Sequence, residues 1–111
     1  MLDVDYHHGN GTQEIFYNRA DVLTISIHAD PLQEFPYFLG FADETGKGKG
    51  EGYHRNLPLR WGAKWDKYEE ALTTAMKALK KFGPDVVVVS LGLDTFKEDP
   101  ISKFKLEHED Y

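Results

Sequence analysis

A run of four consecutive valines constrains the fold of this chain more than any other feature of the sequence. Residues 86–92 read Val-Val-Val-Val-Ser-Leu-Gly, which begins as a continuous apolar stretch of β-branched side chains. Strands of this composition are typical of the centre of a parallel sheet, where both faces are covered. The run therefore predicts a central, buried strand and places the chain in the α/β class.

Three further segments are predicted strands. They span residues 2–6, 22–28 and 53–59, the last of them weaker and closed by Pro58. The second is β-branched and mostly apolar on both faces, as a buried parallel strand should be. Together with a short helix between them, the first two form a βαβ unit, whose crossover is expected to be right-handed.

Two helices are predicted. Thr12 is a candidate cap for a short helix over residues 13–17. A longer amphipathic helix is indicated by apolar residues at helical spacing, and Gly83-Pro84 ends it. The residues assigned to its core face are Trp65, Tyr68, Leu72, Ala75, Met76 and Leu79. The tail from Thr95 onward shows no clear element.

Residues 29–53 lose regular periodicity and collect proline, aromatic and glycine residues. A loop of this length inside a compact domain is usually functional or disordered. Its aromatic cluster favours the wall of a binding site, because disordered segments rarely carry so many rings. The alternative, that the rings only cover one end of the sheet, stays open.

Length and charge narrow the class of protein further. With 111 residues, 41% hydrophobic and 29% charged, the chain is expected to form one domain with a modest core. The absence of cysteine excludes disulfides and thiolate metal sites, so any metal must bind oxygen and nitrogen. The net charge of -6 argues against nucleic acid as a partner and favours a cationic small molecule. Since there is no membrane-length apolar run and no signal segment, we expect no membrane contact and a cytoplasmic location.

The stretch Asp3-Val4-Asp5-Tyr6-His7 carries metal-type ligands at every second position. Alternate side chains of a strand leave the same face, so Asp3, Asp5 and His7 could reach one ion where the first strand ends. Two carboxylates and an imidazole suit a hard or borderline divalent cation, zinc above all. The alternative is that short Asp-x-Asp runs occur by chance at strand ends and that the histidine caps a turn.

Asp94 follows the valine-rich strand. Ligands of parallel sheets gather beyond the carboxyl ends of the strands, so Asp94 would meet Asp5 and His7 if the two strands are neighbours. Three protein ligands leave a coordination position open, which is typical of a catalytic zinc site. Asp94 could instead cap the turn that follows it.

Five motifs occur in a characteristic order along nearly the whole chain. They are residues 3–12 (DVDYHHGNGT), 26–28 (SIH), 40–46 (GFADETG), 89–96 (VSLGLDTF) and 99–102 (DPIS). Together they resemble the histone deacetylase superfamily, and the branch they are most similar to is the acetylpolyamine amidohydrolases. The resemblance implies the arginase/deacetylase fold, a three-layer α/β arrangement of a mainly parallel sheet flanked by helices. In that fold the valine-rich strand lies beside the strand at Asp3, followed by those at Val22 and Tyr53.

The resemblance also implies which residues bind cations and substrate. The zinc of the family would be held by Asp5, His7 and Asp94. A monovalent cation, K⁺ or Na⁺, would lie beside it on Asp3, on Ser26 and on the backbone carbonyls of Asp5, His7 and Ile27. A second cation would bind backbone carbonyls at Phe16, Arg19, Val22 and Tyr53. Phe35 matches a ring that lines the substrate tunnel.

Full-length relatives hydrolyse acetyl amides: zinc polarises the carbonyl, a histidine pair handles the protons and a tyrosine stabilises the oxyanion. In the family the histidine pair precedes the zinc motif and the tyrosine follows it, and this chain contains neither motif. His8 belongs to the zinc motif, and His28, His54 and His108 do not match the pair. We therefore assign no catalytic residue and expect residues 1–111 to form a single truncated, catalytically impaired deacetylase-like domain.

Two alternatives to an impaired amidohydrolase remain. The chain could be a non-catalytic metal-binding or oligomerisation module, in which the apolar edge at residues 86–89 pairs with another copy to give a homo-oligomer. An acetylated amine or polyamine is the ligand expected for either reading. A magnesium-dependent, aspartate-based phosphatase built on Asp3 and Asp5 fits less well, because His7 and Asp94 do not suit that chemistry.

Overall fold

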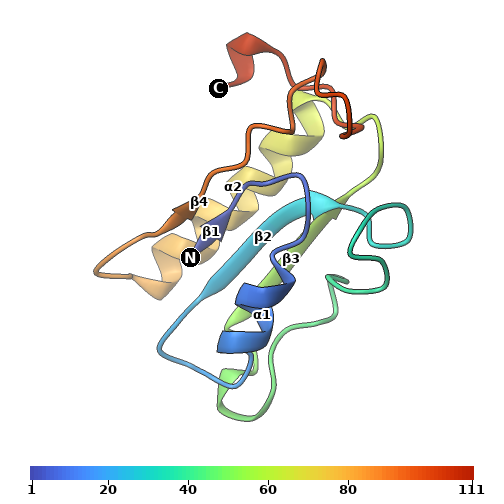
Figure 1. Cartoon of the computed structure of the whole chain (residues 1–111). Helices are drawn as coiled ribbons and strands as arrows, with labels where there is room; N and C mark the ends of the chain where they lie inside the picture. The colour runs from blue at the N-terminus through green and yellow to red at the C-terminus, as the bar shows by residue number, and fades with distance from the viewer.

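The computed structural model describes residues 1–111, and its centre is a four-stranded parallel sheet (Figure 1). The strands lie in the order β3-β2-β1-β4, and every neighbouring pair is parallel. Their bounds are β1 Leu2–Asp3, β2 Thr24–Ala29, β3 His54–Leu59 and β4 Val89–Ser90. The parallel sheet predicted from the sequence and the strand order implied by the family resemblance are confirmed.

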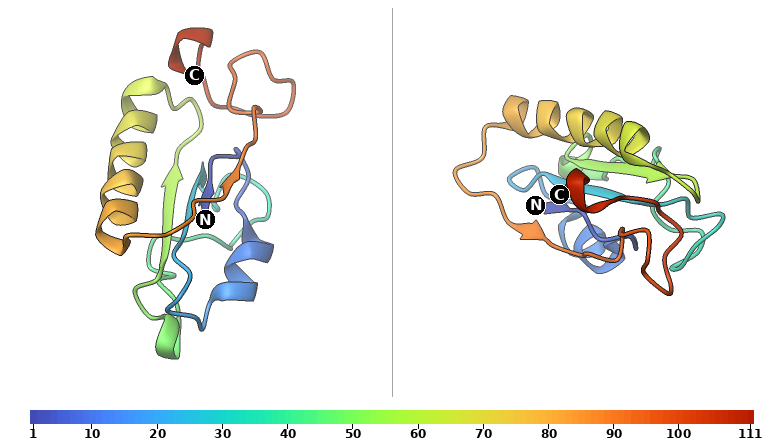
Figure 2. Two further views of the ribbon diagram at one scale, coloured as in Figure 1. Left: turned by 90° about the vertical axis from the view of Figure 1, so that its left-hand side faces the viewer. Right: turned by 90° about the horizontal axis from the view of Figure 1, so that it is seen from above.

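Two helices cover opposite faces of this sheet and give the fold its three layers (Figure 2). They are α1, Asn10–Phe16, and α2, Trp65–Phe82. Two short 3₁₀ helices, η1 and η2, span Gly48–Gly50 and His108–Asp110. The helices of the chain include none that is both long enough and apolar enough to cross a membrane. The α/β class and its three-layer arrangement are thus confirmed.

α2 supplies the apolar layer on one face of the sheet. Its buried residues are Tyr68, Ala71, Ala75 and Leu79. They form one core cluster with Ile25 and Ile27 of β2. The helix ends at Gly83, whose left-handed φ of 67° suits glycine and whose N–H donates to the Leu79 carbonyl at 2.9 Å. The prediction that Met76 belongs to the core is wrong, because that side of α2 is uncovered and Met76 is 53% exposed.

The valine-rich run lies at the open edge of the sheet, so the prediction of a buried central strand is wrong. Residues 86–89 are between 47% and 74% exposed. On its inner side the valine-rich run accepts backbone hydrogen bonds from β1 and the residue that follows it. The N–H of Leu2 donates to the Val88 carbonyl at 2.9 Å, and the N–H of Val4 donates to the Ser90 carbonyl at 3.0 Å. Alternate residues such as Val89 therefore present their backbone groups to the open side. The run is exposed because no strand or helix of this chain covers that side.

Two further differences concern α1 and the tail. Gly9 is the N-cap residue of α1, and the N–H of Gln13 donates to its carbonyl at 3.0 Å, which closes the first turn. Thr12 consequently lies inside the helix and does not cap it. In the tail, Phe104 and Leu106 are buried in the core cluster, so this segment contributes more to the fold than the absence of a sequence signal suggests.

β2 has one apolar and one polar face, which differs from the predicted strand with two mostly apolar faces. Ile25 and Ile27 pack toward α2, and the residues between and beside them face α1. β3 runs alongside in register and adds polar residues to the same side. The buried residues of this polar face are Thr24, Ser26, His28, His54 and Asn56.

Groups of α1 and of the long loop between β2 and β3 form hydrogen bonds with side chains of this polar face. His54 Nε2 donates to Gln13 Oε1 of α1 at 2.7 Å. His28 Nε2 donates to the carbonyl of Gly40 in the loop at 2.9 Å. Glu44 accepts the N–H of Gly40 at 2.9 Å and a hydrogen bond from Gln13. These bonds fasten the loop and its aromatic residues to the sheet.

Two of the three buried imidazoles, those of His28 and His54, predict that the free energy of unfolding falls in mild acid. Burial, with a smaller contribution from His8, lowers the pKa of His28 and of His54 from 6.5 to about 4. Between these values the unfolded chain binds protons that the folded chain does not, so stability is full above 6.5 and is lost as the pH falls toward 4. Urea unfolding from about pH 7.5 to about pH 4.5 measures the slope. His54→Gln should reduce the slope by about one proton, and His108→Gln at the surface should not change it. A pH-independent unfolding free energy would contradict this account.

The open edge of β4 predicts association. An unpaired edge with exposed apolar side chains is a template for another strand, so homo-oligomerisation through β4 stays the expectation. Sedimentation velocity over a wide range of protein concentration measures it. Val89→Lys should shift the chain toward monomer, whereas Ile15→Lys, at a 70% exposed position on α1, should not. A strict monomer at high concentration would refute the expectation.

Candidate metal centre

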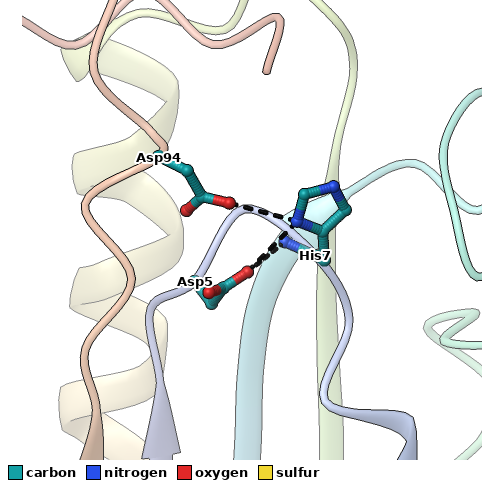
Figure 3. Close-up of side chains that lie close together, drawn as sticks. All are labelled: Asp5, His7 and Asp94. Atoms are coloured by element: carbon teal, nitrogen blue, oxygen red, sulfur yellow. Dashed lines mark hydrogen bonds and ion pairs between the residues drawn. The ribbon is translucent and has the colours of Figure 1, made fainter. Parts of the chain in front are cut away.

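Three ligand-type side chains, Asp5, His7 and Asp94, converge beyond the carboxyl ends of β1 and β4 (Figure 3). One donor atom from each lies within 4.8 Å of the other two. The parallel pairing of β1 with β4 sets Asp3 opposite Ser90, so the segments that leave both strands run side by side. The structure thus brings together all three residues that the sequence predicts as zinc ligands.

His7 lies between the two carboxylates. Its Nδ1 is 3.1 Å from Asp94 Oδ2 and 3.4 Å from Asp5 Oδ1. Backbone groups hold the carboxylates: the N–H of His7 donates to Asp5 Oδ1 at 2.7 Å, and the N–H of Tyr6 donates to Asp94 Oδ1 at 3.0 Å. The three side chains are 24–36% exposed, so an ion can reach them from solvent.

The prediction that Asp5 and His7 share one face of a strand with Asp3 is wrong. β1 ends at Asp3, so Asp5 and His7 lie in a bend and not on one face of a strand. The N–H of Asp5 bonds to Asp3 Oδ1 at 3.1 Å, which turns the chain directly after the strand. The bend aims Asp5 and His7 at Asp94 and leaves Asp3 buried and outside the cluster.

The donor set fits a divalent cation such as zinc. Two carboxylates and an imidazole are ligands that zinc accepts, whereas an imidazole is a poor ligand for magnesium or calcium. The two like-charged carboxylates stand close together with no lysine or arginine paired to them. A cation between them would offset their repulsion. Three protein ligands would leave a coordination position open for another molecule.

The side chains expected to bind a monovalent cation are more deeply buried. Asp3 of β1 and Ser26 of β2 are register partners on neighbouring strands, and both are buried. Burial raises the pKa of Asp3. Ser26 Oγ lies 2.8 Å from His28 Nδ1, and Ile27 is fully buried. A cation at this place stays a prediction.

The residues expected to hold a second cation lie around the start of β2. The carbonyl of Phe16 accepts the N–H of Arg19 at 2.9 Å, and that of Tyr53 accepts the N–H of Thr24 at 3.1 Å. Val22 lies in the irregular segment just before β2. Each of these two carbonyl oxygens keeps a second lone pair with which it could bind a cation. The second cation site also stays a prediction.

Phe35 stands beside the cluster. Its ring lies 6.4 Å from that of His7, centroid to centroid, in an edge-to-face arrangement, and the residue is 61% exposed. The ring centroids of Phe35 and Tyr37, which belong to the same loop, are 6.5 Å apart. Both rings belong to exposed residues, so aromatic surface is open to solvent beside His7.

Buried side chains that were not predicted from the sequence lie behind the cluster. His8 packs on His28 with ring centroids 4.4 Å apart, and Gln13 reaches Glu44 and His54. The alternation of polar and apolar residues in β2 is a signal that could have revealed the polar face. Gln13 and Glu44 gave no such signal, because their contacts join residues 31 and 41 positions apart.

Known proteins are similar in sequence to this chain over its full length. The histone deacetylase domain model matches residues 1–111. Acetylpolyamine amidohydrolase 2 of Pseudomonas aeruginosa is 59% identical over 111 residues, which are 100% of this chain and 32% of that protein. The acetylpolyamine amidohydrolase of Mycoplana ramosa is 55% identical, again over 100% of this chain, and 33% of that protein is covered. The chain therefore spans about a third of the length of these relatives.

Solved structures share the fold as well. The acetylpolyamine aminohydrolase of Burkholderia pseudomallei matches with a TM-score of 0.91 and 47% identity, over 94% of this chain and 30% of that chain. An HDAC homologue complexed with SAHA matches with a TM-score of 0.94 and 39% identity, over 98% of this chain and 30% of that chain. These neighbours have the arginase/deacetylase fold. Because the family model spans every residue and solved relatives share the structure, the chain belongs to the histone deacetylase family.

Proposed function

We propose that this chain provides the zinc-binding part of an amidohydrolase that acts on acetylated amines. The observation that carries the proposal is the convergence of Asp5, His7 and Asp94 within 4.8 Å. The identity to proteins named acetylpolyamine amidohydrolases supports acetylated polyamines as the substrate class. The net charge of -6 supports it as well, because a cationic polyamine is attracted to an acidic protein.

Each residue of the cluster has a task in this proposal. Asp5, His7 and Asp94 would hold the ion, and when bound, zinc supplies Lewis-acid chemistry that polarises a substrate carbonyl. The backbone N–H groups of His7 and Tyr6 fix the two carboxylates in advance, so less ordering is left for the binding step. The ring of Phe35 offers an apolar surface to the alkyl chain of a substrate.

We assign no general acid, general base or oxyanion group to residues 1–111, which cover about a third of the relatives. The Nε2 groups of the buried His28 and His54 are already engaged by Gly40 and Gln13. We therefore expect the 111 residues alone to bind zinc without hydrolysing an amide, as a catalytically impaired form of the family.

We also propose a monovalent cation, K⁺ or Na⁺, beside Asp3 and Ser26. Asp3 is only 7% exposed and forms no ion pair with a basic side chain. A buried carboxylate is costly unless a cation or a proton neutralises it. The second cation, at the carbonyls near Phe16 and Tyr53, has no comparable support and stays a prediction.

Replacing Asp94 tests the cluster. Asp94→Asn removes one anionic ligand and keeps an oxygen that can accept the Tyr6 N–H, so the fold should persist. Zinc affinity should fall by more than about tenfold, since even the groups that only orient ligands have effects of this size. Asp21→Asn, at an exposed ion pair with Arg19, is the matched control and should bind as the parent does. Competition with a chromogenic chelator measures both, and equal affinities would refute the assignment of Asp94.

Deacetylation assays test the expectation that residues 1–111 bind zinc without hydrolysing an amide. The zinc-loaded chain should release no acetate from an acetylpolyamine or from a fluorogenic acetyl-lysine peptide. Turnover that depends on zinc and is lost with Asp94→Asn would show that acid and base groups are present within the chain or its oligomer. Tight binding of magnesium with phosphatase activity, and no zinc binding, would favour the phosphatase alternative instead.

A further inference from the structure

Gly92 lies where the two ligand-bearing segments of the candidate metal centre touch. It follows β4 and stands two positions before Asp94. A Cβ atom placed on Gly92 would lie 2.3 Å from Asp5 Oδ2 and 2.6 Å from both Asp5 Cα and Cγ. A Cβ atom does not approach non-bonded atoms this closely in real proteins, so any side chain at position 92 would have to displace Asp5 or the segment that carries Asp94.

The need for glycine at this position comes from close approach and not from backbone conformation. The glycines with left-handed φ angles are Gly40, Gly46, Gly48, Gly52, Gly62 and Gly83, and Gly92 is not among them. An alanine could therefore adopt the backbone angles of Gly92. What alanine could not do is leave the space that the Asp5 carboxylate and Cα occupy.

Two hydrogen bonds show that this close approach helps to determine the positions of the Asp5 and Asp94 carboxylates. On one side, Asp5 Oδ1 accepts the N–H of His7 at 2.7 Å, so Asp5 is held between that amide and Gly92. On the other side, Asp94 Oδ1 accepts the N–H of Tyr6 at 3.0 Å, which ties the segment after β4 to the segment after β1. A side chain at position 92 would push apart the two segments that this second bond joins.

We infer that Gly92 is a positioning residue of the metal centre: its missing side chain lets Asp5 and Asp94 approach closely enough to share one cation. The inference rests on the proposed function, because it concerns the cation of that same site. A displacement of about 0.5 Å is enough to spoil a site of this kind, since metal–ligand distances are fixed within narrow limits.

Gly92→Ala and Gly11→Ala make a matched pair for the test. Gly11 lies in the first turn of α1, shortly after His7, and a Cβ there meets nothing within 4 Å. Zinc affinity should fall by about tenfold or more in Gly92→Ala, because altering groups that orient metal ligands has effects of this size. It should stay unchanged in Gly11→Ala. Cobalt(II) loaded in place of zinc should give a visible spectrum altered in shape only in Gly92→Ala, which a mere loss of stability would not produce.

Amide hydrogen exchange of the metal-free variants separates positioning from folding. In Gly92→Ala the amide of Tyr6 should exchange faster, because its bond to Asp94 is broken, while the amides of β2 and β3 stay protected. Loss of protection throughout the sheet would make Gly92 a requirement of the fold and overturn the inference. Equal zinc affinity and equal cobalt spectra in parent and Gly92→Ala would overturn it too, with the proposed function intact. Failure of the parent chain to bind zinc or cobalt would overturn both.

Discussion

The pairing of β1 with β4 is the contact on which the candidate site depends. Each strand contributes only two residues to the sheet, yet the pairing carries Asp94 to His7 across 87 positions of sequence. Because the strands are parallel, both leave the sheet at the same end, and two segments remote in the chain meet there. An antiparallel pair would have placed Asp5 and Asp94 at opposite ends, and the cluster could not form.

The architecture was predictable where the signal lies within one element. The spacing of Ala75 and Leu79 fixes the buried side of α2, and Gly83 marks its end, because both depend on near neighbours in sequence. The exposure of residues 86–89 was not predictable in this way. Their composition is typical of a buried strand, but their actual burial depends on which other segments pack beside β4.

The candidate site divides along the same line. The identities of Asp5, His7 and Asp94 could be read from the sequence, because carboxylates and imidazoles stand where parallel strands end. The reason for their convergence could not, because a bend after β1 aims the side chains and the period of a strand does not. The role of Gly92 was equally invisible, since it depends on a contact with a residue at the other end of the chain.

Asp94 follows β4, which is the strand with the weakest attachment to the sheet. β2 and β3 share a six-residue register, but β4 is attached to β1 alone and through two register pairs. Detachment of β4 would therefore dismantle the cluster while the rest of the sheet stays folded. Binding of the proposed cation and the docking of β4 would consequently be linked equilibria, and such a linkage is reciprocal. A molecule that pairs with the outer edge of β4 would therefore raise the affinity for the proposed cation without contacting Asp5, His7 or Asp94.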